Sequence, residues 1–153
     1  MIAVIQRVDS AEVIADGTLS GKIGKGLYVL LGVEKNDTTK DAVALAEKIS
    51  KLRIFSDNNG KMNLSVLDIG GEVLSVSNFT LCANYSHGNR PEYFNAETPE
   101  LAKKLYHFFN EEISRITGKC EAGVFGADMH TYMTTDGPVT IFMDSYVLLR
   151  KER

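Results

Sequence analysis

The chain has 153 residues, of which 44% are hydrophobic and 24% are charged, and its formal net charge is −3. These values are typical of a globular protein and exclude a disordered chain. The acidic balance also excludes a broad nucleic-acid-binding face, which must neutralise many phosphates, but not a site that holds one end of a nucleic acid. We expect residues 1–153 to form a single domain.

The N-terminal segment Met1–Arg7 lacks a basic start, and Gln6 and Arg7 interrupt its apolar run, so it is not a signal peptide. No apolar run is long enough to cross a membrane. The two cysteines, Cys82 and Cys120, are too few for a disulfide scaffold and indicate reduced thiols. We therefore predict a cytoplasmic protein without a membrane partner.

The first third of the chain predicts strands. Ile2–Val8 reads as a strand, and Asp16-Gly17 is a two-residue hairpin signal between Val13–Ala15 and Thr18–Ile23. The continuous apolar run Leu27–Val33 is typical of a strand that is covered on both faces.

Two segments have helical periodicity. The first begins near Thr38 or Thr39, carries Asp41 in its first turn, and repeats apolar residues at Ala42, Leu45, Ala46, Ile49 and Leu52. The second has Thr98 as N-cap, Pro99 in its first turn and Gly118 after its last. Its predicted apolar face comprises Leu101, Leu105, Phe108, Phe109, Ile113 and Ile116.

Further strands are predicted between and after the helices. Glu72–Leu81 alternates as a strand does, and the polar loop Asn84–Asn95 that follows is long enough to be functional. The last strands are predicted at Cys120–Phe125, Met129–Met133 and Val139–Met143, with a turn at Asp136-Gly137, and Ser145–Leu149 either extends the last strand or contacts a partner. The pattern, rich in sheet with two helices, indicates an α+β domain.

The segment Ser77–Leu81 is the first candidate site. Thr80 is a candidate nucleophile, but no nearby acid or histidine pair offers a base to activate its hydroxyl. The alternative is that the backbone N–H groups of Phe79 and Thr80 hold a developing oxyanion. The structural reading, in which Ser77 and Thr80 only end a strand, remains open.

The segment Thr135–Thr140 is the second candidate site. Its Gly137-Pro138 step lacks one donor, has one fixed dihedral angle, and is of the kind that adopts cis peptide bonds. A rigid turn of this kind suits selection between mirror-image ligands, although an ordinary turn between strands explains the same residues.

The sequence gives little support for a thiol nucleophile, a metal site or a phosphate-binding loop. Cys82 with His87 as its base would make a thiol esterase, although the spacing says nothing about their geometry. No His, Cys and Asp spacing resembles a metal site, and the glycines at 21, 24 and 26 do not form a phosphate loop. We therefore predict neither a metal nor an organic cofactor.

Taken together, the motifs resemble the D-aminoacyl-tRNA deacylase family over essentially the full length of the chain. The matching segments, in chain order, are Ile5–Val8, Gly26–Val33, Arg53–Phe55, Lys61–Val66, Gly70–Glu72, Ser77–Leu81, Arg90-Pro91, Phe125–Met129 and Asp136–Thr140. The resemblance implies a barrel-like, mostly antiparallel sheet with a smaller sheet as a lid and two helices.

The resemblance also implies the roles of site residues. In this family a homodimer inserts a Gly-cisPro pair, here Gly137-Pro138, into the partner's pocket, and an arginine matching Arg7 braces it. The backbone that faces this pair, here Ser77 to Leu81, holds the ester and a water. The residues that position the ester carbonyl are Ser77, Phe79 and Thr80. In the family, backbone groups and the 2′-hydroxyl of the tRNA contribute to catalysis in addition to the side chain at the position of Thr80. Residues matching Phe125 and Met129 hold the terminal adenosine of aminoacyl-tRNA.

The implied reaction is hydrolysis of the ester of D-aminoacyl-tRNA, and of mischarged glycyl-tRNA, as chiral proofreading in translation. Two positions depart from the family, which usually has Gln in place of Asn78 and Asn in place of Thr135. Asn78 lies in the implied substrate-binding site. The alternatives are a related deacylase that removes L-amino acids from mischarged tRNA, and a noncatalytic tRNA-binding module.

Overall fold

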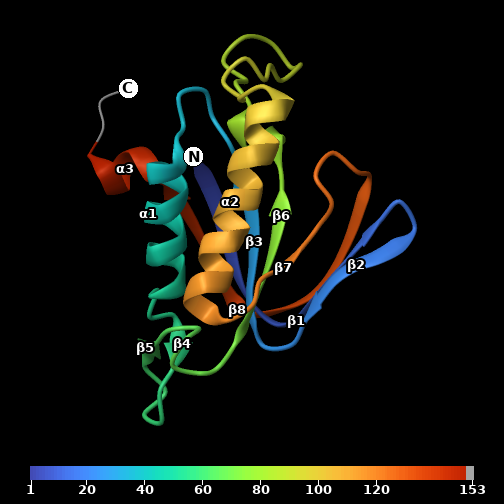
Figure 1. Ribbon diagram of the computed structural model, residues 1–153. Helices are drawn as coiled ribbons and strands as arrows, with labels where there is room; N and C mark the ends of the chain where they lie inside the picture. The colour runs from blue at the N-terminus through green and yellow to red at the C-terminus, as the bar shows by residue number, and fades with distance from the viewer. Residues whose placement is uncertain (151–153) are drawn as a thin grey trace.

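The structure is a computed structural model that describes residues 1–150 (Figure 1). One large sheet is covered by helices, and a separate small sheet lies beside it. The strands are β1 (Ile2–Ala15), β2 (Thr18–Ile23), β3 (Gly26–Gly32), β4 (Phe55–Ser56), β5 (Met62–Leu64), β6 (Glu72–Ser77), β7 (Glu121–Ala122) and β8 (Met129–Asp144). The helices are α1 (Thr39–Ser50), α2 (Pro99–Thr117) and α3 (Ser145–Leu149), with a 3₁₀ turn, η1, at Phe79–Cys82.

The large sheet has the order β2-β1-β3-β6-β7, and β8 also pairs with β1. Pairs β1–β2, β1–β3 and β1–β8 are antiparallel, whereas β3–β6 and β6–β7 are parallel. The two ends of the sheet approach each other, because the Ser20 hydroxyl on β2 donates to Ala122 O on β7 at 2.8 Å. The sheet is therefore a nearly closed, mixed barrel, which confirms the predicted α+β class.

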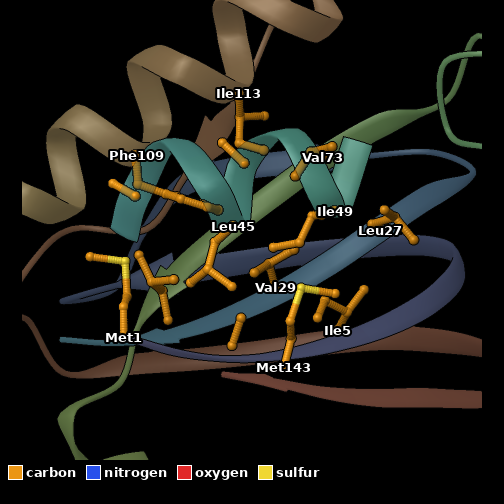
Figure 2. Packing of buried hydrophobic residues seen from close by; sticks show 14 of the residues in the cluster. Met1, Ile5, Leu27, Val29, Leu45, Ile49, Val73, Phe109, Ile113 and Met143 are labelled. Atoms are coloured by element: carbon orange, nitrogen blue, oxygen red, sulfur yellow. The ribbon is translucent and has the colours of Figure 1, made fainter. Parts of the chain in front are cut away.

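Helices α1 and α2 lie side by side across one face of the sheet (Figure 1). Their apolar sides meet strand residues that point to the same face, and Figure 2 shows this packing. Leu45 and Ile49 on α1, with Phe109 and Ile113 on α2, are fully buried against a layer that includes Val29. Their burial removes large apolar side chains from water, which is the main driving force for this arrangement.

A second cluster fills the interior of the barrel. Tyr28 and Leu74 point away from the helices, because they alternate along the strands with the helix-facing Val29 and Val73. The remaining buried members are Val8, Ala11, Val13, Ile23 and Val76. Each central strand is thus buried on both faces, as the apolar run Leu27–Val33 predicts.

Both predicted helices are confirmed, and their ends follow the expected chemistry. The Thr38 N–H donates to Asp41 Oδ2 at 2.9 Å at the start of α1. Thr98 is the N-cap of α2, and Gly118 ends it with φ of 87°. Leu101 is an exception to the predicted apolar face, since 48% of its surface is exposed. The structure adds the short helix α3 at Ser145–Leu149, where the sequence predicted a strand or a partner contact.

Three strand predictions are corrected. The strand predicted over Glu72–Leu81 ends at Ser77, because Asn78 turns the chain into the 3₁₀ turn η1. Within Cys120–Phe125 only Glu121–Ala122 pairs, with β6. The predicted turn at Asp136-Gly137 does not separate two strands, since β8 pairs with β1 on both sides of it.

None of the helices within residues 1–150 is both long and apolar enough to cross a membrane.

Candidate functional site

The segment Ser77–Cys82, which we call the Ser77–Cys82 turn, leaves the end of β6. The Asn78 N–H donates to Leu31 O on β3 at 2.8 Å, which fixes the start of the turn. At Gly32 there is no room for a side chain, because a Cβ there would come within 3.0 Å of Leu81 Cβ. The turn therefore packs tightly against β3.

The side chain of Asn78 organises this turn. Its Oδ1 accepts the Thr80 N–H at 3.2 Å and also contacts the Thr80 hydroxyl. Asn78 thus occupies both donors of Thr80, including a backbone N–H that the sequence proposes as an oxyanion donor. Thr80 is exposed, and no base is paired with its hydroxyl in these contacts, which argues against direct nucleophilic attack by its side chain.

A cavity of about 510 Å³ opens beside the turn, and we call it the main cavity. It brings together five of the predicted residues, which come from the Ser77–Cys82 turn and from the segment before and into β8. Its full lining is Leu31, Val33, Ser77, Asn78, Phe79, Tyr93, Ala96, Glu97, Pro99, Ala102, Phe125, Gly126, Ala127 and Met129. A mostly apolar lining with few polar groups is typical of a small-molecule site.

A second hollow of about 410 Å³, the barrel cavity, adjoins the main cavity. Ser77, Asn78, Ala127 and Met129 line both. The barrel cavity adds polar groups of the strands, namely those of Gln6, Tyr28 and Thr131. The Ser77–Cys82 turn therefore begins at the junction of an apolar and a more polar compartment.

Tyr106 on α2 connects the walls of the main cavity. Its hydroxyl donates to Ser75 O on β6 at 2.9 Å and contacts Gly123 O at 3.3 Å. Burial raises the pKa of the Tyr106 phenol, so the hydroxyl stays protonated and able to donate. Its ring lies 6.0 Å from that of Phe125. Tyr106 thereby links the strand that ends at Ser77 to the segment that carries Phe125.

Gly137 and Pro138 lie outside both cavities and are exposed. Gln6 pairs with Thr140 and Val8 with Thr135, so the residues between them on β8 bulge out of the ladder. We call Asp136–Val139 the Gly137–Pro138 bulge. The Gly137-Pro138 peptide is cis, as the family resemblance implies. At Gly137, φ is 124° and a Cβ would come within 2.8 Å of Val139 N, so only glycine fits.

Arg7 holds the bulge from behind. Its Nε lies 2.9 Å from Asp136 Oδ2 and 3.3 Å from Asp136 O, while Nη1 donates to Ile54 O at 2.6 Å. Arg7 is buried, so its charge is little screened and the ion pair with Asp136 is stronger than one in water. Arg7 therefore holds Asp136 at the start of the bulge, and its role in bracing the Gly-Pro pair stays a prediction.

The sequence missed much of the cavity wall. Tyr93, Ala96, Glu97 and Pro99 come from the loop and the start of α2, and Ala102 from its first turns. The length of the loop Asn84–Asn95 was a signal that it has a role. No local signal marked Ala102, whose place depends on how α2 crosses the sheet.

Cys82 and His87 are poor candidates for a thiol esterase. Burial raises the pKa of the Cys82 thiol to about 11, and its Sγ lies 3.5 Å from Val33 O. A thiol with this pKa is almost entirely protonated at neutral pH and is a weak nucleophile. His87 is exposed, and its Nδ1 contacts Ser86 Oγ at 2.8 Å. Within residues 1–150 there is no group of three His, Cys, Asp or Glu side chains arranged to hold a metal ion.

Comparisons with known proteins agree with this arrangement. The family model described as D-Tyr-tRNA(Tyr) deacylase matches residues 4–144. A D-aminoacyl-tRNA deacylase of Thermosipho melanesiensis is 55% identical over 95% of this chain and 97% of its own length. One of Persephonella marina is 53% identical over 97% of this chain and 100% of its own length.

Among solved structures, the c-Myc DNA Unwinding Element Binding Protein superimposes with a TM-score of 0.88 at 39% identity, covering 94% of this chain and 98% of its own. Matches of this identity and coverage place the chain among hydrolases that act on ester bonds. The chain belongs to the D-Tyr-tRNA(Tyr) deacylase family, whose relatives above are named D-aminoacyl-tRNA deacylases.

Proposed function

We propose that the protein hydrolyses the ester bond of D-aminoacyl-tRNA, and that of mischarged glycyl-tRNA, and releases the free amino acid and tRNA. The observation that carries this proposal is the junction of the main cavity with the Ser77–Cys82 turn. A mostly apolar compartment there, whose one charged lining residue among those described is Glu97, adjoins the backbone N–H groups of the turn. Such a site favours a substrate that is already activated, and an aminoacyl ester is one.

In this proposal the terminal adenosine of the tRNA occupies the main cavity. The cavity has the size and apolar lining that a nucleoside base needs. Phe125 offers an aromatic ring and Met129 a polarisable thioether, and both groups contact bases favourably. The adjoining Ser77–Cys82 turn then lies where the 3′ ester of the same nucleotide begins.

The ester carbonyl is then held by the backbone of the turn. The N–H groups of Phe79 and Thr80 are the proposed donors, and Ser77 lines the approach from β6. Because the Thr80 N–H donates to Asn78 Oδ1, a carbonyl oxygen that takes this donor displaces the Asn78 amide. Water attacks the carbonyl, the negative charge develops on the oxygen held by these donors, and the ribose hydroxyl leaves with a proton.

Selection of the D-isomer is assigned to the Gly137–Pro138 bulge of a second subunit. Supporting this, the bulge is exposed, braced by Arg7 and absent from the main cavity of its own chain. Its backbone would receive the α-amino group of the substrate, while the ring of Pro138 excludes an L side chain. Selection by exclusion leaves a D side chain free, so many D-amino acids and glycine fit.

A first experiment compares hydrolysis of D-tyrosyl-tRNA, glycyl-tRNA and L-tyrosyl-tRNA. The wild type is expected to cleave the first two and to spare the third. Pro138→Ala removes the ring that excludes an L side chain, so it should narrow the ratio of D to L rates by about tenfold. Faster cleavage of L-tyrosyl-tRNA by the wild type identifies the L-selective alternative, and tRNA binding without turnover identifies the noncatalytic one.

A second experiment tests whether the bulge of one subunit completes the site in the cavity of the other. Ala127→Trp fills the main cavity, and Gly137→Ala breaks the bulge, so each variant alone should be inactive. Unfolding and refolding the two together should recover about a quarter of the wild-type activity, because half of the dimers are mixed and each has one complete site. No recovery, with mixed dimers shown by mass spectrometry, contradicts selection by a partner subunit.

A further inference from the structure

The loop Asn84–Asn95 stands at one end of the barrel, next to the start of α2 (Figure 1). Backbone hydrogen bonds hold its shape: the N–H of Asn84 donates to Glu92 O at 2.7 Å and the N–H of Glu92 to Asn84 O at 2.8 Å. The loop is also tied to the rest of the fold, because the Lys35 N–H donates to Asn95 O at 2.9 Å. It therefore presents its side chains on a fixed frame.

A hollow of about 390 Å³ lies on this loop and is separate from the two cavities already described. We call it the loop hollow. Its lining is His87, Arg90, Pro91, Glu92, Tyr93 and Phe94. Tyr93 lines both the loop hollow and the main cavity, so the two adjoin at this residue. The Tyr93 ring is in turn held edge-on by Phe79 of the Ser77–Cys82 turn, with ring centroids 4.9 Å apart.

Two aromatic side chains of this loop, one of them in the lining of the hollow, are largely open to water. Phe94 is 71% exposed and Tyr85, in the same loop, 78% exposed. Exposed aromatic groups that gather at one place mark a contact surface more often than isolated ones do. Arg90 supplies a positive charge and a planar group that stacks on bases, while Glu92 is the carboxylate of this lining.

We infer that the loop hollow binds the single-stranded nucleotide that precedes the terminal adenosine of the tRNA. This inference rests on the proposed function, which puts the terminal adenosine in the main cavity. A strand that leaves the main cavity past Tyr93 enters the loop hollow directly. Unpaired bases are recognised by stacking on aromatic and arginine side chains, and the adjoining phosphate by a positive charge.

The charge of the chain fits this mode of recognition. A net charge of −3 does not support a grip on many phosphates, but one arginine and a few rings suffice for one or two nucleotides. Stacking raises affinity by about fivefold to 150-fold per base, which is a measurable effect without a basic face. The substrate would thus be recognised through its 3′ end rather than along its duplex.

The first test measures binding without any reaction, with adenosine and with the trinucleotide CCA as probes. The wild type should bind CCA at least about tenfold more tightly than adenosine, because stacking is gained in the loop hollow. Arg90→Ala and Phe94→Ala should each remove much of this difference while leaving the affinity for adenosine unchanged. Glu92→Gln should increase affinity for CCA, since it removes a negative charge near the phosphate.

The second test compares hydrolysis of D-tyrosyl-tRNA with that of D-tyrosyl-adenosine. Phe94→Ala and Arg90→Ala should raise KM for the tRNA and leave both constants for D-tyrosyl-adenosine unchanged. Arg90→Ala should also reduce the slope of log KM against log salt by about one. Lys104→Ala is the control, because Lys104 is an exposed lysine on α2 that pairs with Glu100.

Three results would overturn the inference: equal binding of CCA and adenosine by the wild type, equal loss on both substrates in the variants, or conversion of dimers to monomers by Phe94→Ala. The last would identify the loop as a subunit contact. Failure of the proposed function is distinguishable, because the wild type would then cleave neither D-tyrosyl substrate even if it preferred CCA in binding.

Discussion

The main cavity and the Gly137–Pro138 bulge differ in how much of their surroundings a single chain supplies. The cavity is enclosed by residues from β3, the Ser77–Cys82 turn, α2 and the start of β8. The bulge is held by the Arg7–Asp136 pair and by Val139, which packs against the core, while Gly137 and Pro138 are exposed. The cavity therefore has walls that one chain supplies, whereas the exposed part of the bulge is left uncovered by its own chain.

The difference has a physical cause in how each region is stabilised. The walls of the cavity are held by core packing and by the buried Tyr106 hydroxyl, so their shape follows from the fold. The bulge gains less burial, because only Val139 of its described residues packs against the core, and the shape of its exposed part depends on a glycine conformation and on one buried guanidinium. Substitutions should therefore affect the two regions independently.

Gly137→Ala is expected to have the largest effect. An added Cβ would lie 2.8 Å from Val139 N and 2.9 Å from Val139 Cγ2, in a backbone conformation that L side chains rarely adopt. We expect hydrolysis of D-tyrosyl-tRNA to fall by about 100-fold or more, since misplacing a positioning group costs this much. Affinity for adenosine should stay unchanged, because the main cavity is not altered.

Gly60→Ala is the matched control for Gly137→Ala. Gly60 also has a positive φ, of 73°, but a Cβ there would meet nothing within 4 Å. Both variants carry the backbone cost of a positive φ, of about 1 to 2 kcal/mol. Gly137→Ala also forces the Val139 backbone to move, so its melting temperature should fall further than that of Gly60→Ala. If the two variants hydrolyse D-tyrosyl-tRNA equally well, the bulge has no role in the reaction.

The two regions also differ in how much the sequence could predict. The α1 and α2 periodicities predicted both helices, because the signal for a helix is local and its capping residues, Thr38 and Thr98, lie beside it. The Ser77–Cys82 turn was predicted as strand, since the residues alternate as in a strand. What ends the strand is the side chain of Asn78, which accepts the Thr80 N–H.

The bulge was predicted as a turn between strands for a related reason. Asp136-Gly137 followed by proline has the local chemistry of a turn, and in the structure these residues do leave the pairing with β1. Only the pairing of β8 with β1 on both sides, from Ile2 to Ala15, makes it a bulge within one strand. Such long-range pairing is not encoded in a window of a few residues.

Tyr106→Phe should have a moderate effect, confined to the main cavity. The ring stays, but Ser75 O and Gly123 O lose the Tyr106 hydroxyl, which costs about 1 kcal/mol of stability, while the Gly123 N–H still donates to Ser75 O. Because Phe125 is then less well positioned, KM should rise by about threefold to tenfold on both D-tyrosyl-tRNA and D-tyrosyl-adenosine, with kcat nearly unchanged.

Tyr146→Phe is the control for Tyr106→Phe. The Tyr146 hydroxyl on α3 donates to Lys35 O at 3.4 Å, and neither Tyr146 nor Lys35 lines the main cavity. It should leave KM unchanged on both substrates. A KM effect of Tyr106→Phe on the tRNA substrate alone would contradict the role given to Tyr106, since a loosened cavity must also weaken binding of the adenosine ester.

Cys82→Ala should have the smallest effect on activity, although Cys82 directly follows the Ser77–Leu81 motif. Its side chain is buried against Val33 O, and burial raises the pKa of its thiol to about 11. The native thiol stays neutral where the unfolded one, with an ordinary pKa near 9.0, ionises. The free energy of unfolding should therefore be full below pH 9 and fall as the pH rises toward 11, and Cys82→Ala should make this fall shallower.

Urea unfolding at pH 8 and pH 10.5 measures the difference, and hydrolysis of D-tyrosyl-tRNA by Cys82→Ala at pH 7.5 should stay within about twofold of wild type. Loss of hydrolysis in a variant that still unfolds cooperatively would reinstate a thiol nucleophile and displace the backbone donors from the centre of the reaction.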